Sequence, residues 1–347
     1  MQNKSYRVPN STLLQYDALS HEAVDAITSQ FYDSYGPLSS SHGERGLQAS
    51  REEIKYHLSY LRPTLETGYI QSYVEYLRWL SDVFLARKRP VEQLEVVLGW
   101  LGDYFVKMLE QDGDVIKSAL DDAIAESKKT SDLPEENNKF LPEVLSFELA
   151  LLKGDRAMAI AIVEQLYKSG ISVVEIEVLL IEAAMYEIGL KWQKNQVSVA
   201  QEHLASATAS TVMAELFSNS HMSRPNGKKA ILACVESNLH MLGLSMISDA
   251  LQLDGWEVQF LGANTPTASL IEHIGVNKPD MVGVSVAFSS QVSAARDVFA
   301  GVRSIFPKNC PYLIVGGNAV NRYPELFKLI GADESAKNAM AVAAKLN

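Results

Sequence analysis

Hydrophobic positions in the first 136 residues recur with helical spacing after an irregular start. Ser50 and Glu53 have the spacing of a capping box and predict that a helix begins there. We expect a second, aromatic-rich helical stretch over Tyr69–Ala86 and a third that runs from Pro90 to Met108. The polar segment 127–139 has no hydrophobic pattern, so it predicts a linker after an N-terminal helical domain.

Four helical pieces with short connections follow, and they place a bundle between residues 137 and 224. The pieces are Phe140–Lys153, Arg156–Ser169, Ser172–Lys194 and Ser198–Asn219. Four helices joined by short loops are typical of a helix bundle. A second linker, His221–Lys228, contains a proline and a glycine and should end the bundle.

From residue 225 to 347 the pattern changes to short apolar runs that alternate with helical stretches. The expected strands are Ala230–Val235, Glu257–Leu261, Met281–Val286 and Tyr312–Val315. Strands that are apolar on both faces favour a parallel sheet covered by helices on each side. The predicted fold class is therefore multidomain, α and α/β: a helical domain (1–136), a four-helix bundle (137–224) and a doubly wound, Rossmann-like domain (225–347). Its ligand should lie at the carboxyl ends of the strands.

Composition narrows the function further. Hydrophobic residues make up 47% and charged residues 21%, as in globular proteins, and the net charge of -11 argues against direct nucleic-acid binding. The apolar runs are too short to span a bilayer, and the N-terminus lacks a secretory signal. Cys234 and Cys310 read as core thiols in a reducing compartment. We therefore expect a cytoplasmic protein that binds neither nucleic acid nor membrane.

The segment Glu236–Gly243, directly after the first strand, carries the candidate chemistry. Familiar nucleotide and metal motifs are missing, because no G-x-G-x-x-G follows this strand and the chain has no H-E-x-x-H and no CxxC. His240 can point out of the domain at the strand ends and offer a nitrogen to a metal. Gly243 lets another body approach closely. When the segment is taken alone, a capped turn with an incidental histidine is the more common explanation.

Three later residues should lie at the same edge of the sheet as His240. They are Ser285, which ends the third strand, and Gly316 and Gly317, which follow the fourth. Together with His240 they resemble the cobalamin-binding pattern of methionine synthase and its relatives. The resemblance implies that His240 is the lower axial cobalt ligand. It also implies that the displaced dimethylbenzimidazole tail enters a slot lined by the serine and the glycines.

The same resemblance defines the cofactor-binding loop and one departure from the family pattern. The implied loop residues are Asn238, Leu239, His240, Met241 and Gly243. The segment Leu261–Pro266 fits the loop after the second strand. The family's usual aspartate is Asn238 here, and a neutral amide can still orient the imidazole but should leave it a less basic ligand.

The bundle carries a second match. Trp192 is followed, after nine residues, by Glu202 and His203. This arrangement resembles CarH-type light sensors, and it implies adenosylcobalamin with these three residues around the upper adenosyl group. The alternative interpretation of this spacing is a core tryptophan and an unrelated Glu-His pair on the surface. Gln193 stands where CarH has a histidine, so His203 or water should take the upper cobalt position after light.

The N-terminal domain lacks the charge and compact pattern of a helix-turn-helix domain. Its layout resembles photocobilins, bacterial light sensors with a helical biliverdin-binding domain beside a cobalamin module. The resemblance implies biliverdin as a second chromophore, and the candidate residues are His57, Arg62, Tyr73 and Tyr76. No cysteine precedes residue 234, so such a bilin would be held noncovalently. An amphipathic helix pair packed on its neighbours is the alternative.

These resemblances imply a photoreceptor rather than an enzyme. Light-driven loss of the adenosyl group would change domain packing or the oligomeric state of a homo-oligomer, or would signal to an unidentified effector protein. The main alternative is a corrinoid methyl-carrier protein of a methyltransferase system, which shares the bundle and the α/β domain. A cobalamin-dependent mutase is disfavoured, because the chain has no room for a (β/α)8 barrel beside these segments.

Overall fold

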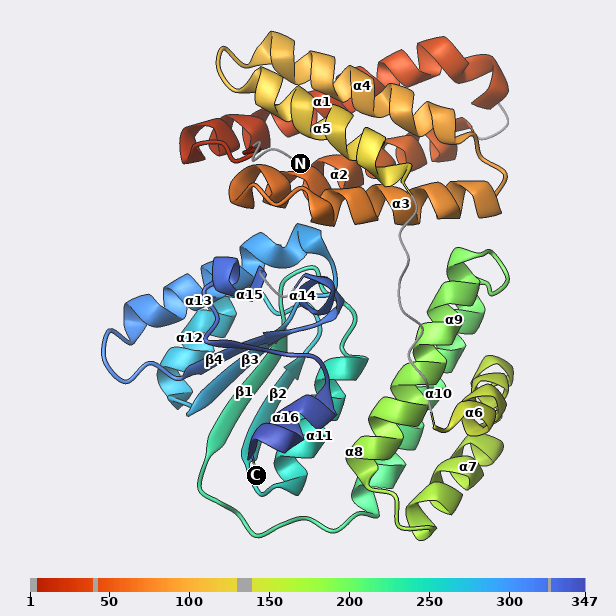
Figure 1. The fold of residues 1–347 in the computed structure, drawn as a ribbon, viewed down its shortest axis with the longest axis vertical. Helices are drawn as coiled ribbons and strands as arrows, with labels where there is room; N and C mark the ends of the chain where they lie inside the picture. The colour runs from red at the N-terminus through yellow and green to blue at the C-terminus, as the bar shows by residue number, and fades with distance from the viewer. Residues whose placement is uncertain (1–4, 40–42, 130–138, 324–325, 347) are drawn as a thin grey trace. The chain divides into compact units, whose positions relative to one another are not determined.

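The computed structural model describes residues 5–39, 43–129, 139–323 and 326–346. The chain divides into two compact units, residues 1–133 and 134–347, and each is described by itself (Figure 1). The predicted boundary at residues 136 and 137, and most of the predicted linker 127–139, lie outside the described residues.

Unit 1 is helical. Its described residues form α1 (Asn10–Ser39), α2 (Gly43–Thr67), α3 (Gln71–Ala86), α4 (Val91–Met108) and α5 (Gly113–Ser127). The described residues before Asn10 are irregular, as predicted, but α1 begins at Asn10 and was not among the predicted helices. The predicted helix start at Ser50 is wrong, since α2 begins at Gly43 and the capping-box spacing lies inside the helix. Helix α1 is easily missed because only a narrow stripe of it is buried among polar residues.

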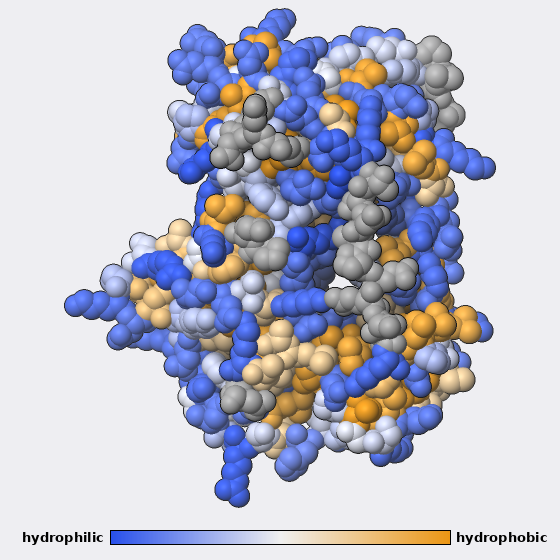
Figure 2. Space-filling model, viewed as in Figure 1, coloured by the Kyte–Doolittle hydropathy of each residue, from blue (hydrophilic) through white to orange (hydrophobic). Residues whose placement is uncertain are grey.

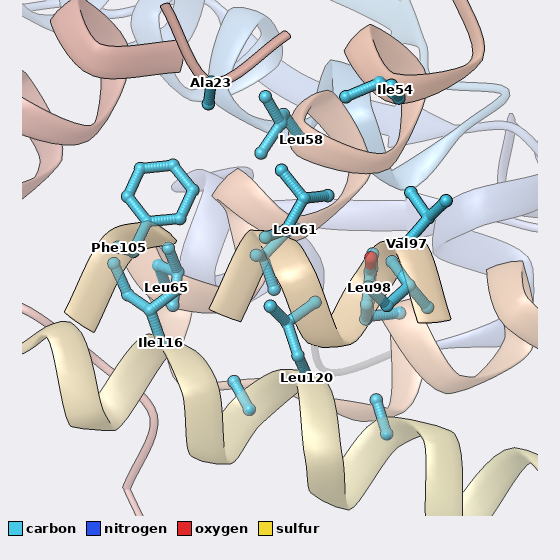
Figure 3. Packing of buried hydrophobic residues seen from close by; sticks show 14 of the residues in the cluster. Ala23, Ile54, Leu58, Leu61, Leu65, Val97, Leu98, Phe105, Ile116 and Leu120 are labelled. Atoms are coloured by element: carbon cyan, nitrogen blue, oxygen red, sulfur yellow. The ribbon is translucent and has the colours of Figure 1, made fainter. Parts of the chain in front are cut away.

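The core of unit 1 is built where α2, α4 and α5 meet (Figure 3). Leu61 and Leu65 of α2 are fully buried beside Phe105 of α4 and Leu120 of α5. Tyr16 of α1 stacks on Phe105, with ring centroids 4.8 Å apart. Helices from both ends of this unit thus share one hydrophobic core.

Unit 2 begins with the predicted bundle, which the structure confirms. Its helices are α6 (Leu141–Lys153), α7 (Arg156–Lys168), α8 (Val173–Ile176), η1 (Glu177–Glu182), α9 (Ala183–Gln193) and α10 (Val199–Ser218). Segments α8, η1 and α9 follow one another without a break and replace the single predicted third helix. The middle segment, η1, is π-helical, which the hydrophobic pattern did not reveal.

The second half of unit 2 is the predicted parallel α/β domain. Its strands are β1 (Lys229–Cys234), β2 (Glu257–Gly262), β3 (Met281–Ser285), β4 (Tyr312–Gly316) and β5 (Glu334–Ala336), in the order β2-β1-β3-β4-β5. Every pairing is parallel. The helical segments are α11 (Leu242–Leu253), α12 (Thr267–Asn277), η2 (Ser289–Gln291), α13 (Val292–Ile305), α14 (Asn318–Arg322), α15 (Leu326–Ile330) and α16 (Ala339–Leu346). Strand β5, with three residues, was too short to predict.

The bundle and the α/β domain share buried contacts. Met246 and Ala250 of α11 and Ala339 of α16 belong to the same hydrophobic cluster as the bundle helices. Helices α11 and α16 therefore join the two halves of unit 2.

The described surface carries both hydrophilic and hydrophobic residues. No helix among the described residues is long and apolar enough to cross a membrane. The face in Figure 2 is largely hydrophilic with separate hydrophobic patches.

Candidate functional site

The carboxyl ends of the strands form one row of paired residues. Cys234 of β1 pairs with Ser285 of β3, Ser285 pairs with Gly316 of β4, and Gly316 pairs with Ala336 of β5. The sequence-based expectation that Ser285 and Gly316 share an edge with the loop after β1 therefore agrees with the observed register.

The loop between β1 and α11 is held by its two neighbouring loops. Ser237 has a left-handed backbone (φ 66°), and its N–H donates to Asn264 Oδ1 at 2.7 Å. The N–H of Asn264 donates in turn to the carbonyl of Asn238 at 2.8 Å. On the other side, Gln291 Nε2 donates to the carbonyl of Ser237 at 2.9 Å. These bonds fix the loop before any ligand binds, which lowers the ordering cost of binding.

Asn238 positions His240 through the backbone. Its side chain is fully buried, and Nδ2 donates to the carbonyl of Ser285 at 2.9 Å. Its Oδ1 accepts the backbone N–H of His240 at 3.0 Å. Asn238 thus shapes the loop that carries the imidazole, and its expected role in orienting the ring stays a prediction. An aspartate could not donate to the Ser285 carbonyl, which explains why an amide suits this position.

His240 presents its side chain at the surface of the loop. The edge of the ring meets Phe288, with centroids 5.0 Å apart and planes at 90°. Partial burial lowers the pKa of the imidazole below its usual value, and the carboxylate of Glu202 opposes this shift. The neutral imidazole favoured in this way is the form that binds a metal.

Apolar side chains around His240 are exposed. Leu239 is 71% exposed, Met241 is 40% exposed, and Phe288 is also accessible. A Cβ at Gly243 would meet nothing within 4 Å, so the start of α11 is open to a ligand. The Thr265 hydroxyl, in the neighbouring loop, is buried without a hydrogen-bond partner among the described residues. A ligand with apolar surface and at least one polar group fits these features.

The paired glycines are required by the protein's own backbone. Gly317 has a left-handed φ of 99°, and a Cβ there would lie 2.4 Å from the carbonyl oxygen of Val286. A Cβ at Gly316 would lie 2.9 Å from the carbonyl oxygen of Ala336. Close approach of these chain segments therefore explains both glycines without a cofactor tail. Any tail slot must lie on their other sides.

The residues predicted for the upper site lie at one end of the bundle. Trp192, near the end of α9, packs partly buried against the bundle core, and Gln193 is the last residue of that helix. On α10, Glu202 Oε1 accepts a hydrogen bond from Ser206 Oγ at 2.7 Å, and Oε2 pairs with His203 Nδ1 at 2.6 Å. Helix α10 packs against α11, the helix that follows the β1–α11 loop, and the Glu202 carboxylate acts to raise the pKa of the His240 imidazole.

Three of the four candidate residues in unit 1 lie together. The His57 side chain is 1% exposed, and its Nδ1 lies 2.8 Å from the hydroxyl of Tyr76. Burial lowers the pKa of His57 to about 4. Tyr73 lies against Tyr76 at 5.7 Å between ring centroids, and its buried hydroxyl has no hydrogen-bond partner among the described residues.

Arg62, the fourth candidate, is engaged elsewhere. Its Nε and Nη2 donate to the two carboxylate oxygens of Asp17 at 2.8 and 3.0 Å, and Nη1 donates to Glu66 at 3.0 Å. A bilin propionate would have to displace one of these carboxylates.

Sequence reasoning missed the residues that hold the cofactor loop. Gln291 bonds across 54 residues of sequence, and its Oε1 also accepts the N–H groups of Ala287 and Phe288. Asn264 belongs to a segment matched to the family, but its contact with Ser237 was not foreseen. An amide at the start of a helix is common, so neither residue carries a recognisable signal.

Comparison with known proteins identifies the class of module. Residues 228–344 match the family model described as B12 binding domain, and residues 146–216 match a second model with the same description. Together they cover the bundle and the α/β domain and support cobalamin as the cofactor. Unit 2 is thus a cobalamin-binding module.

Individual relatives belong to two groups. The chain is 30% identical over 151 residues to the HTH-type transcriptional repressor CarA of Myxococcus xanthus, which is 42% of this chain and 51% of the repressor. It is 26% identical over 167 residues to dimethylamine corrinoid protein 3 of Methanosarcina acetivorans, which is 48% of this chain and 77% of that protein. The chain thus spans only about half of the repressor's length.

The fold comparison agrees with the predicted fold class. The solved structure of the Methanosarcina barkeri monomethylamine corrinoid protein superimposes with a TM-score of 0.51 and 16% sequence identity, covering 59% of this chain and 97% of that chain. A helical bundle followed by a parallel Rossmann-like sheet is therefore the fold of a known corrinoid protein.

Proposed function

We propose that this protein is a light sensor that uses adenosylcobalamin, rather than an enzyme. The observation that carries the proposal is that α10, the bundle helix with Glu202, packs against α11, the helix that follows the His240 loop. Glu202 and its neighbours would then be available to a cofactor held on His240. The partial match to a CarA repressor also supports the proposal of a light sensor.

The residues of the His240 loop would have distinct roles in holding the cofactor. His240 would supply a neutral nitrogen to cobalt, and the bonds of Asn238 to His240 and Ser285 would keep that nitrogen in place. Leu239 and Met241 would exclude water from the lower face. Bound adenosylcobalamin would supply absorption of visible light and a cobalt–carbon bond that breaks on excitation.

The bundle would sense whether the adenosyl group is present. The indole of Trp192 offers a flat surface to adenine, and the Glu202 carboxylate can accept hydrogen bonds from ribose hydroxyls. Both residues would lack these partners in the protein without an adenosyl group. Because the bundle and α11 share one core, this difference should change how the two halves pack, and the signal should pass through a homo-oligomer or an effector protein. Since Gln193 offers no imidazole, His203 or water would be the group available to the cobalt.

The decisive experiment uses the full chain reconstituted with adenosylcobalamin in the dark. We expect the absorption spectrum to change under green light, together with the size measured by light scattering. The methylcobalamin-loaded protein, treated identically, is the comparison. A spectrum and size that light leaves unchanged would refute the sensor.

The second candidate is a corrinoid methyl-carrier protein. It is favoured by the match to dimethylamine corrinoid protein 3, of which the chain covers 77%. A carrier should bind methylcobalamin at least as tightly as adenosylcobalamin, whereas the sensor should prefer the adenosyl form. Competition between the two cobalamins separates these functions.

We further propose that unit 1 holds a noncovalent biliverdin. The unpartnered, buried hydroxyl of Tyr73 beside His57 and Tyr76 supports this, because such a group gains free energy from any polar ligand atom. Both cysteines of the chain lie outside unit 1, which excludes a thioether link there. Adding biliverdin to the full chain should give a red-shifted, protein-bound band that His57→Ala disturbs. A band unaffected by that substitution would exclude His57 and its neighbours as the bilin site.

A further inference from the structure

A buried carboxyl group lies where the bundle meets the α/β domain. Glu177, the first residue of η1, is completely buried. Neither of its carboxylate oxygens has a hydrogen-bond donor among the described residues. The group that faces it is a second carboxyl, Asp249 of α11. No ion pair joins either carboxyl to a lysine or arginine in the part of the chain that the structure describes.

The Glu177–Asp249 pair lies where helices of the bundle pack against the α/β domain. Segments α8 and η1 pack against α11, the helix that follows the His240 loop (Figure 1). Asp249 lies between Met246 and Ala250, which belong to the hydrophobic cluster of the bundle. The pair therefore bridges the two halves of unit 2, with Glu177 fully buried and Asp249 half-buried beside apolar residues. The π-helical turn begins at Glu177 itself, and such turns are frequent at functional sites.

Two lysines near these elements are already engaged by other carboxylates. Lys191 of α9 forms an ion pair with Glu148 of α6. Lys139 pairs with Glu175 of α8 at 3.0 Å. Asp249 is the charged group that acts on Glu177, and burial together with this neighbour holds the pKa of the Glu177 carboxyl well above its usual range.

We infer that Glu177 and Asp249 share one proton, and that this proton is part of the contact between the bundle and the α/β domain. One carboxyl keeps the proton and donates an O–H···O hydrogen bond to the other, which carries the single negative charge. Release of the proton to water leaves two carboxylates facing each other. Two like charges that face each other repel strongly when one of them is fully buried, because little water screens it.

The sign of the pH effect follows from the raised pKa. The unfolded chain releases this proton near pH 4.3, roughly the ordinary value for glutamate. The folded protein keeps it, so the stabilising contribution is fully present below that pH and is lost as the pH rises towards the folded-state pKa. The contact between α8, η1 and α11 should therefore weaken on the alkaline side. This inference requires neither light nor an adenosyl group.

The test compares Glu177→Gln with the wild-type full chain. Glutamine has nearly the same shape and cannot ionise, and its amide can donate to Asp249. Raising the pH from about 6 to about 9 should lower the wild-type unfolding midpoint of unit 2 by about 5–10 °C. The Glu177→Gln protein should show a much flatter profile. Glu187→Gln, which changes an exposed carboxyl on α9, should keep the wild-type profile.

Infrared spectroscopy reports the proton directly. The wild-type protein at neutral pH should show the carbonyl stretch of a protonated, buried carboxylic acid, and Glu177→Gln should lack it. If Glu177→Gln does not fold, Asp249→Asn serves instead. Its amide can donate to Glu177, so both the pH dependence and the band should shrink. A variant that retains the wild-type pH profile and the carboxylic-acid band would overturn the inference.

Discussion

At the scale of single residues, Asn238 shows how a departure from a family pattern can have a local cause. Its amide both donates and accepts, to the carbonyl of Ser285 and from the N–H of His240. Asn238→Asp would place a carboxylate against a buried carbonyl oxygen. We expect cobalamin affinity to fall by about tenfold or more, measured by spectroscopic titration, because residues that orient a ligand have effects of this size.

Asn226→Asp is the matched control for this substitution. The Asn226 amide also donates to a backbone carbonyl, that of Asp254 at 3.1 Å, but it is exposed and lies in the linker before β1. The Asn226→Asp protein should bind cobalamin with the affinity of the wild type. Equal affinities for both variants would mean that the Asn238 hydrogen bonds do not hold the loop.

His240→Ala tests the lower ligand itself. Removal of the imidazole should weaken cobalamin binding and abolish the spectrum of the histidine-ligated cofactor, because the alanine loop offers cobalt no nitrogen at this position. His221→Ala, at an exposed linker position, should change neither property. A histidine-ligated spectrum that survives His240→Ala would assign the ligand to another residue.

The glycines make a pair of opposite predictions. Gly317→Ala brings a Cβ to 2.4 Å from the Val286 carbonyl in a left-handed conformation, and should cost about 1–3 kcal/mol of folding free energy or more. Gly243→Ala meets nothing within 4 Å in the protein alone and should leave the apo protein's stability unchanged or higher. Its cobalamin affinity should fall if the cofactor lies on the start of α11. Denaturant unfolding and titration separate the two effects.

The sequence predicts the edge of this site better than its supporting contacts. Ser285 and Gly316 could be placed beside the His240 loop because parallel strands end together. Gln291 could not, because its bond to Ser237 depends on how two loops fold against each other. The need for glycine at position 317 could not be predicted either, because it arises from the Val286 carbonyl, whose proximity becomes known only from the fold.

At the scale of elements, the bundle and the strands were predictable because their hydrophobic positions repeat over long stretches. The shortest and least periodic elements were not. Strand β5 has three residues, and α1 buries only a narrow stripe. The π-helical turn η1 adds one residue to a helical turn without altering the apolar pattern enough to be seen.

Helix α10 carries the prediction that separates the two proposed functions. Glu202→Ala should weaken adenosylcobalamin binding by about tenfold or more while leaving methylcobalamin binding nearly unchanged, because hydrogen bonds to a charged group contribute about 1.5–3 kcal/mol. Glu215→Ala, on the same helix in an exposed ion pair with Arg156, is the control and should affect neither cofactor. Equal losses for both cobalamins would favour the methyl carrier.

At the scale of the whole molecule, the two units should respond to acid differently. His57 is buried in unit 1, and its pKa is lowered from 6.5 to about 4. Between these pH values the unfolded chain therefore binds a proton at His57 that the folded unit does not bind. Its contribution to stability is full above pH 6.5 and falls as the pH drops towards 4. His57→Gln should flatten this acid dependence. The measurement is denaturant unfolding of the full chain between these pH values, and an unaltered slope would contradict the prediction.

The aligned row from Cys234 through Ser285 and Gly316 to Ala336 has a consequence for how such chains can diverge. A single inserted residue within β1, β3 or β4 would turn alternate side chains to the opposite face and break the alignment with the next strand. Insertions at the amino ends of the strands, far from this row, would leave it intact. Length variation among descendants of this gene should therefore accumulate at one rim of the sheet and be rare at the other.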